Sequence, residues 1–267
     1  MNQDDLSFFH SWFRSYLKSY YSEDSYVQMN IKLKEGHTYR VCENIVMIGR
    51  DMNLDEEQLR IGETTALFHD IGRFEQFKRY KTFNDRRSQN HAKLSVEILK
   101  REGVLKRLPE EEETIIYKTV SYHNLYKLPI GEEGICLFYT KLLRDADKLD
   151  IWSTVLEYSG KRHLHPNPAL ELELPDTKEY SPKFIDSIMN CRCTDVGNMK
   201  TCNDMKLSML SWVFDVNFLP TYHYIRHHEY VDRVVDSLPN TEDIRKAQKH
   251  VNRYIKRKLT SNNSVST

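Results

Sequence analysis

The chain has 267 residues, and its 39 Lys+Arg side chains balance its 39 Asp+Glu side chains, so its formal charge at pH 7 is zero. That balance argues against a partner that is a nucleic acid polymer, because such binding needs a basic excess over a whole domain. Gly and Pro are too few for the many tight turns of a β-sandwich. We therefore expect an all-α protein that forms a single domain over residues 1–267.

The chain carries no apolar run near the ~20 residues of a membrane-spanning helix. Its first residues include acidic side chains where a signal peptide has basic ones. The five cysteines are an odd number scattered along a long chain, which does not resemble a disulfide framework. We expect a cytoplasmic protein that has no membrane partner.

Apolar residues recur at helical spacing in the first part of the chain. They predict helices at residues 5–21, 37–48, 56–70 and 89–101. Gly36 precedes the second of these, and Asp55 caps the third. Ser88 caps the fourth, and Ile71-Gly72 breaks the third just after His69 and Asp70.

The second part of the chain alternates between helical periodicity and a proline-rich stretch. The periodicity predicts helices at residues 110–123, 131–152, 207–214 and 244–259. Between them we expect an insertion at residues 158–203 that contains one short helix at 184–189. C-terminal helices then occupy residues 204–259, and a polar tail covers residues 260–267.

Histidines and aspartates lie beside apolar residues on five of these helices, at His37, His69-Asp70, His91, His123 and Asp147. A single histidine of this kind is ordinarily a core or boundary residue. Several imidazoles and carboxylates buried together are favourable when a cation holds them, and they are the ligands of Zn, Fe and Mn. The set therefore predicts a metal site.

His37, His69-Asp70 in ALFHDIGRF and Asp147 in RDADKLDIW follow the H…HD…D order of the HD-domain superfamily of metal-dependent phosphohydrolases. The chain resembles this family over roughly residues 25–157. The resemblance implies an HD-domain helical bundle with additional N- and C-terminal helices. It also implies that His37, His69, Asp70 and Asp147 bind a divalent metal, with Asp145 as the alternative to Asp147.

His91 and His123 resemble two further positions of the family. In some members these histidines extend the site to a second metal, and in others the first of them donates a proton beside the phosphate. Both alternatives stay open here, and we favour two metals. The ions would be Mn, Fe, Zn, Ni, Co or Mg.

The resemblance implies hydrolysis of a phosphoester in a small phosphorylated substrate, such as a nucleotide. A bound metal lowers the pKa of water from 15.7 to about 7 and would supply the attacking hydroxide. We expect catalytic roles for Asp70 and His91, and we place Arg73 and Lys148 within reach of the phosphate. The substrate and the oligomeric state are left open.

Two other functions fit the same residues. A di-iron oxygenase would also use His91 and His123, and a non-catalytic sensor would keep the metal only for structure. Weaker signals lie in the second part of the chain. They are a cysteine set without zinc-knuckle spacing, a histidine cluster and a basic last helix. These comprise Cys191, Cys193 and Cys202 with His163 and His165, then His223, His227 and His228, and finally residues 249–259.

Overall fold

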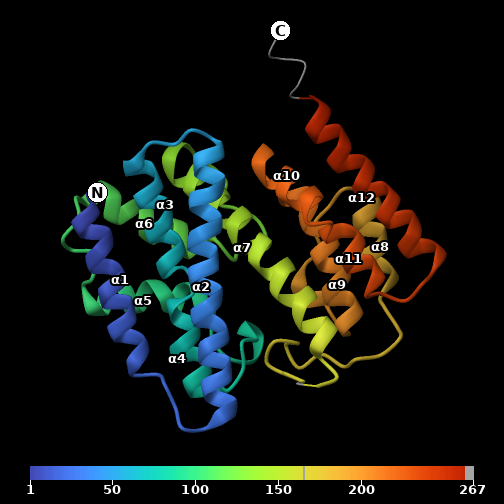
Figure 1. Ribbon diagram of the computed structural model, residues 1–267, viewed down its shortest axis with the longest axis horizontal. Helices are drawn as coiled ribbons and strands as arrows, with labels where there is room; N and C mark the ends of the chain where they lie inside the picture. Colours follow the sequence, from blue (N-terminus) through green and yellow to red (C-terminus); the bar gives the residue numbers. More distant parts are fainter. Residues whose placement is uncertain (165, 262–267) are drawn as a thin grey trace. The chain divides into compact units, whose positions relative to one another are not determined.

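The computed structural model describes residues 1–164 and 166–261. These residues form α-helices and short 3-10 helices and contain no strand, which confirms the all-α fold class (Figure 1). His165 and most of the predicted polar tail lie outside the described residues.

The chain divides into two compact units, Met1–Asp150 and Ile151–Thr267. The long helix α7 (Gly134–Lys161) runs through the boundary between them. The expected single domain stays a prediction, because compactness does not measure whether the two units unfold together.

The first unit contains six helices ahead of α7, and α2 packs against α3 and α4 (Figure 1). Helix α5 lies between α4 and α6, and α1 packs on α3. The bounds are α1 Gln3–Lys18, α2 Ser25–Asp51, α3 Glu56–Phe68, α4 Ile71–Tyr80, α5 His91–Glu102 and α6 Glu110–Tyr122.

Three predicted helix ends in this unit were wrong. Helix α2 begins at Ser25, where the Asp24 side chain accepts a hydrogen bond from Val27 N, so Gly36 lies inside the helix. The cap of α5 is Asn90, while the Ser88 hydroxyl donates to a nearby backbone carbonyl. The third predicted helix ends at Phe68 rather than at Asp70, and α4 begins at Ile71, where a break was expected.

Aromatic rings fill the core between α1 and the helices beneath it. The ring centroids of Phe9 and Phe68 lie 5.5 Å apart, and those of Phe13 and Phe74 lie 6.0 Å apart. All four side chains are fully buried. Edge-on aromatic pairs of this kind add to the hydrophobic effect, and they hold α1 on α3 and α4.

The junction of α3 and α4 is tied directly to α5. Gly72 N donates to the Ser95 hydroxyl at 2.9 Å, and that hydroxyl donates to the His69 carbonyl at 2.9 Å. A Cβ atom at position 72 would lie only 2.5 Å from the His91 carbonyl oxygen. Glycine therefore allows the two backbones to approach at this point.

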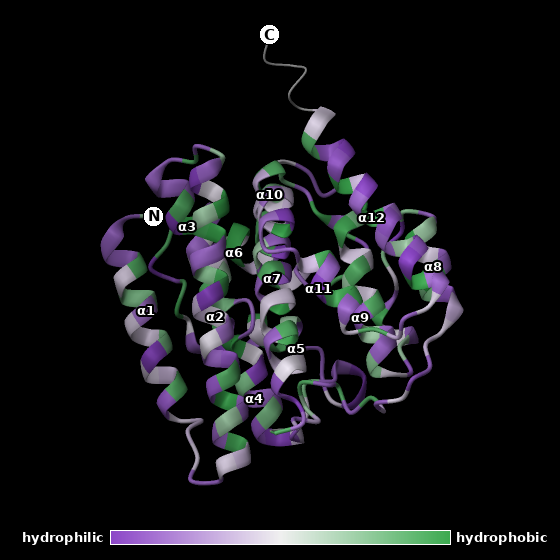
Figure 2. Cartoon of the chain, turned by 45° about the vertical axis from the view of Figure 1, so that its right-hand side comes forward, coloured by the Kyte–Doolittle hydropathy of each residue, from purple (hydrophilic) through white to green (hydrophobic). Residues whose placement is uncertain are grey.

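The second unit packs α8 and the pair α10 and α11 against α12, and α9 against α8 and α11. The short predicted helix at 184–189 is confirmed as part of α8. The new bounds are α8 Pro182–Met189, α9 Cys202–Ser211, α10 Leu219–His227, α11 Tyr230–Asp236 and α12 Glu242–Ser261. In Figure 2 the green patches on these helices mark the apolar residues of this part of the chain.

Asp204 is fully buried and joins three segments of the second unit. Its carboxylate accepts hydrogen bonds from Ser181 N at 2.6 Å, from the Ser181 hydroxyl at 2.9 Å and from Lys200 N at 2.9 Å. Because Asp204→Ala leaves these buried donors unpaired, we expect a loss of about 2–4 kcal/mol in the free energy of unfolding. Urea denaturation measures it, and exposed Asp243→Ala should change it by less than about 1 kcal/mol.

Candidate metal centre

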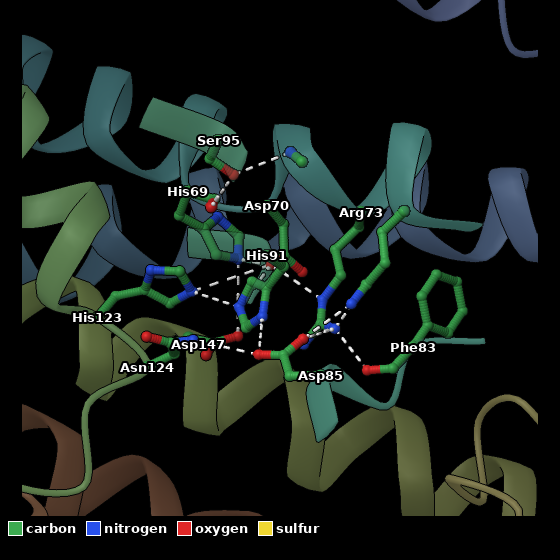
Figure 3. Close-up of polar contacts among 12 residues, drawn as sticks. His69, Asp70, Arg73, Phe83, Asp85, His91, Ser95, His123, Asn124 and Asp147 are labelled. Atoms are coloured by element: carbon green, nitrogen blue, oxygen red, sulfur yellow. Dashed lines mark hydrogen bonds and ion pairs between the residues drawn. The ribbon is translucent and has the colours of Figure 1, made fainter. Parts of the chain in front are cut away.

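Histidines and aspartates from six helices meet in the first unit, and all are buried except the partly exposed Asp147. Figure 3 shows five of them, His69, Asp70, His91, His123 and Asp147. The helix junction places two of them, because His69 ends α3 and Asp70 precedes α4. His91 is the first residue of α5, and His123 follows the last residue of α6. His37 comes from α2, and Asp147 comes from α7.

One group of ligand atoms gathers around His37. Its Nε2 lies 3.2 Å from His69 Nε2 and 3.4 Å from Asp70 Oδ2. Asp147 Oδ1 lies 3.2 Å from the same His37 nitrogen and 3.8 Å from His69 Nε2. These are the four residues whose ligation the H…HD…D order implies. Asp145, the alternative to Asp147, is fully buried on the same helix.

A second group of ligand atoms shares Asp70 with the first. Its Oδ1 lies 3.3 Å from His91 Nε2 and 3.9 Å from His123 Nε2, and these two nitrogens are 3.0 Å apart. The two carboxylate oxygens of Asp70 thus face different histidine pairs. Both triads are compact enough to hold an ion.

Each of the four histidines donates its Nδ1 proton to an oxygen. His37 donates to Asp150 Oδ2 at 2.6 Å, and His91 donates to Asp85 Oδ2 at 2.7 Å. His69 and His123 each donate to a backbone carbonyl at 2.7 Å. In a neutral imidazole such a partner leaves the lone pair on Nε2, as in histidines that bind a metal.

The spacing and chemistry of these atoms fit a divalent ion. Two donors bound to one ion at about 2.1 Å lie about 3.0 Å apart at a right angle and about 3.4 Å apart in a tetrahedron. The distances between the Nε2 atoms within each pair, 3.2 and 3.0 Å, match the edges of such a shell. Moreover, Asp147 Oδ1 is buried without a hydrogen bond.

The charges of the cluster set His37 apart from the other three histidines, whose pKa values are all lowered. Burial lowers the pKa of His37, but the carboxylates of Asp147, Asp150 and Asp70 outweigh it and raise the value to about 10. Burial and the neighbouring imidazoles lower the pKa of His123 to about 3. Burial and Arg73 also lower the pKa of His91. The pair of His91 and His123 is therefore neutral at pH 7.

Burial by itself raises the pKa of Asp70, but the cations around it hold this pKa well below its usual range. Lys34 Nζ lies 2.8 Å from Asp70 Oδ2, and Arg73 Nε lies 3.5 Å from Oδ1. The Asp70 carboxylate is therefore ionised and able to bind a cation.

The sequence analysis missed three residues of this centre. Asp150 stands in the ADKLD block, so the motif already contained it. Asp85 begins the short 3-10 helix η1 (Asp85–Arg87), and Lys34 lies one helical turn before His37. Neither of these two has a signal in the periodicity, and only the fold brings them to the cluster.

Arg73 and Lys148 both have hydrogen-bond partners within the protein in this structure. Arg73 Nη1 donates to the Phe83 carbonyl at 2.6 Å and to Asp85 Oδ1 at 2.9 Å. Lys148 is 8% exposed, and its Nζ donates to the Arg144 carbonyl at 3.5 Å. Their contact with a phosphate stays a prediction.

Asp85 orients His91 from the 3-10 helix η1, which precedes α5, and this orientation can be tested. Asp85→Asn offers His91 Nδ1 an amide that can donate, which favours the tautomer with the proton on Nε2. We expect the affinity of the second ion to fall about 10- to 100-fold while that of the first ion is retained. Calorimetric titration with Mn²⁺ measures both affinities. Asp55→Asn, which exchanges one good helix cap for another, should leave both unchanged.

The weaker sequence signals do not assemble a metal site among the residues described, where both metal-sized groups belong to the first unit. Cys191 Sγ lies 3.2 Å from His250 Nε2, while Cys193 donates to the Ser211 carbonyl. His228 stacks on Tyr230.

Comparison with known proteins places the cluster in a family. Residues 35–152 match the family model described as HD domain. No curated protein and no solved structure gives a significant match. The buried His/Asp cluster fits an HD metal site. No helix in residues 1–164 and 166–261 has the length and apolar character needed to cross a membrane.

Proposed function

We propose, from the match of residues 35–152 to the HD-domain family model, that this chain is a metal-dependent hydrolase that cleaves a phosphoester of a small molecule such as a nucleotide. The family supports a metal-dependent hydrolase in general. The nature of the cleaved bond, a phosphoester, and the small size of the substrate are proposed here in addition.

The observation that carries the proposal is the second histidine pair. His91 and His123 point unprotonated Nε2 atoms at each other across 3.0 Å, and both rings are buried. Two lone pairs that face each other repel unless a cation lies near both of them. Asp70 Oδ1 also faces these two nitrogens. His91, His123 and Asp70 would therefore bind a second ion, besides the one that His37, His69 and Asp147 would share.

The residues of the cluster then have distinct tasks. His37, His69, Asp70 and Asp147 would hold one ion, and Asp70, His91 and His123 would hold the other. Ions bound there would act as Lewis acids and lower the pKa of a water molecule. Asp150 and Asp85 keep the histidines in the binding tautomer through their Nδ1 atoms. With His91 as a ligand, its role as proton donor is the less favoured alternative.

Two cations beside Asp70 would receive the phosphate. Lys34 and Arg73 both approach the Asp70 carboxylate, and both also lie over the face of Phe83. Phosphate oxygens near the cluster would meet these positive groups, which would stabilise the charge that develops during hydrolysis. Lys34 thus joins Arg73 and Lys148 as a candidate phosphate-binding residue.

The test is elemental analysis of the purified protein together with a phosphatase screen. We expect about two divalent ions per chain and release of inorganic phosphate from nucleotides or sugar phosphates, lost on chelation and restored by the ion. Two irons with oxygen consumption and no phosphate release would favour the di-iron oxygenase instead. Stoichiometric metal with no turnover in either assay would favour the non-catalytic sensor.

A further inference from the structure

A cavity of about 450 Å³ lies in the second unit, outside the HD domain. It is bordered by the chain around the start of α10 and by the last turns of α12, two helices that contact each other. Val216 and Leu219 supply apolar walls, Tyr222 and Tyr254 supply rings, and Arg257 and Lys258 supply charge. Pockets for small molecules have volumes of about 300–1,000 Å³ and this kind of mixed lining.

The lining of this cavity contains no acidic residue. Three other cavities of the protein are each lined by at least two acidic side chains beside their cations. An anion that enters the cavity on α12 therefore meets positive charge without a competing carboxylate in the wall.

Helix α12, which lines one side of the cavity, extends this positive field. Helix α12 has no acidic residue from Ile244 to its end at Ser261, although the whole chain has equal numbers of acids and bases. Its buried side has a strict helical period, so the basic side chains lie on the outer face, which is largely purple in Figure 2. The basic residues of this helix are Arg245, Lys246, Lys249, Arg253, Lys256, Arg257 and Lys258.

The two cations of the cavity are held beside an aromatic ring. The Arg257 guanidinium carbon lies 5.9 Å, and Lys258 Nζ lies 5.4 Å, from the centroid of the Tyr254 ring. Within the described residues neither cation forms an ion pair with a carboxylate. Their field also reaches His250, whose pKa is lowered by burial and then by Arg257 and Arg253.

We propose that this cavity binds a nucleoside phosphate, with the phosphates at Arg257 and Lys258 and the base against Tyr254 and Leu219, while the buried ring of Tyr222 forms part of the floor. Cations bind phosphate through charge-assisted hydrogen bonds, and tyrosine rings offer a surface on which a base stacks. A membrane or a nucleic acid polymer would use the whole basic face of α12, whereas the cavity at one end of it suits a small ligand. The site is separate from the proposed hydrolase centre and does not depend on it.

The test compares two double variants that each remove two cations from α12. Arg257→Ala with Lys258→Ala alters the cavity, while Arg245→Ala with Lys249→Ala removes exposed cations of the same helix outside it. Calorimetry of the full chain with an ATP analogue that has an imido bridge avoids hydrolysis. We expect binding at least about 10-fold weaker in the cavity variant and changed less than about twofold in the control.

Two further measurements identify the source of the signal. Photolabelling with 8-azido-ATP should mark a peptide that contains Tyr222 or Tyr254, and tripolyphosphate and adenosine should each bind more weakly than the analogue. Equal weakening in both double variants would overturn the proposal in favour of a diffuse polyanion surface. Labelling confined to residues 35–152, or no saturable binding, would also overturn it, whatever the phosphatase screen shows.

Discussion

Replacement of Asp70 by Asn should remove bound metal from both halves of the cluster at once. The two oxygens of Asp70 face separate histidine pairs, so an amide offers an oxygen to only one of them. Loss of a residue that only orients a ligand costs about 10- to 100-fold in affinity or activity. Loss of the shared ligand should therefore lower hydrolysis by at least about 1,000-fold. Metal content per chain and the rate of phosphate release measure the effect.

Glu75→Gln is the matched control for this variant. Glu75 lies on α4 close to Asp70, is 7% exposed, and pairs with Arg79 and Arg101 outside the cluster. The Glu75→Gln variant should keep its metal and its activity. Circular dichroism should show that the Asp70→Asn variant remains folded without its ions, as expected of an enzyme. If the Asp70→Asn variant unfolds on loss of metal, the non-catalytic sensor is supported. If this variant keeps its full metal content, the shared role of Asp70 is contradicted.

Gly72→Ala should destabilise the first unit more than any surface substitution. The new methyl carbon would lie 2.5 Å from the His91 carbonyl oxygen and 2.8 Å from Ser95 N, and both are backbone atoms that cannot rotate away. Helices α4 and α5 must separate, which also weakens the hydrogen bond from Gly72 N to the Ser95 hydroxyl. We expect a loss of about 2–4 kcal/mol in the free energy of unfolding. Thermal and urea denaturation measure it.

The same change should also reduce metal binding, because the junction that moves carries His69 and Asp70. Gly62→Ala on α3 is the control. There the new carbon would meet Ile45 and Leu142 side chains at 3.7–3.8 Å, which is ordinary contact. Alanine favours a helix by about 1 kcal/mol over glycine, so this variant should be neutral or more stable. If Gly72→Ala and Gly62→Ala change stability and metal binding equally, the close approach of the two backbones at Gly72 does not determine the geometry of the site.

The sequence predicted the helices of the first unit wherever an apolar period and a cap coincided. Asp55 and Gln58 form the predicted capping box. The sequence-based prediction misplaced the start of α2 because Gly36 was interpreted as a boundary. In the structure α2 packs against α3 and α4 and continues through Gly36. Propensity is a weak guide where tertiary contacts compensate for one glycine.

The order H…HD…D also named, from the sequence, the residues that the structure brings together at one point. That was possible because metal ligands must be imidazoles or carboxylates, and their helices must end or turn where the ligands lie. Lys34 and Asp85 carried no such mark. A lysine on a helix and an aspartate in a short 3-10 turn are ordinary surface residues until the fold brings them to Asp70 and His91.

By itself, then, the sequence determined the helical class, the resemblance of residues 35–152 to an HD domain and which side chains could bind a metal, because these depend on local period and residue chemistry. Only the tertiary structure decided that Asp70 divides its oxygens between two histidine pairs and that every Nδ1 proton has an acceptor. It likewise decided that Arg257 and Lys258 line a cavity without acids. These properties depend on distances between atoms far apart in the chain, which the packing of helices sets and a linear pattern does not contain.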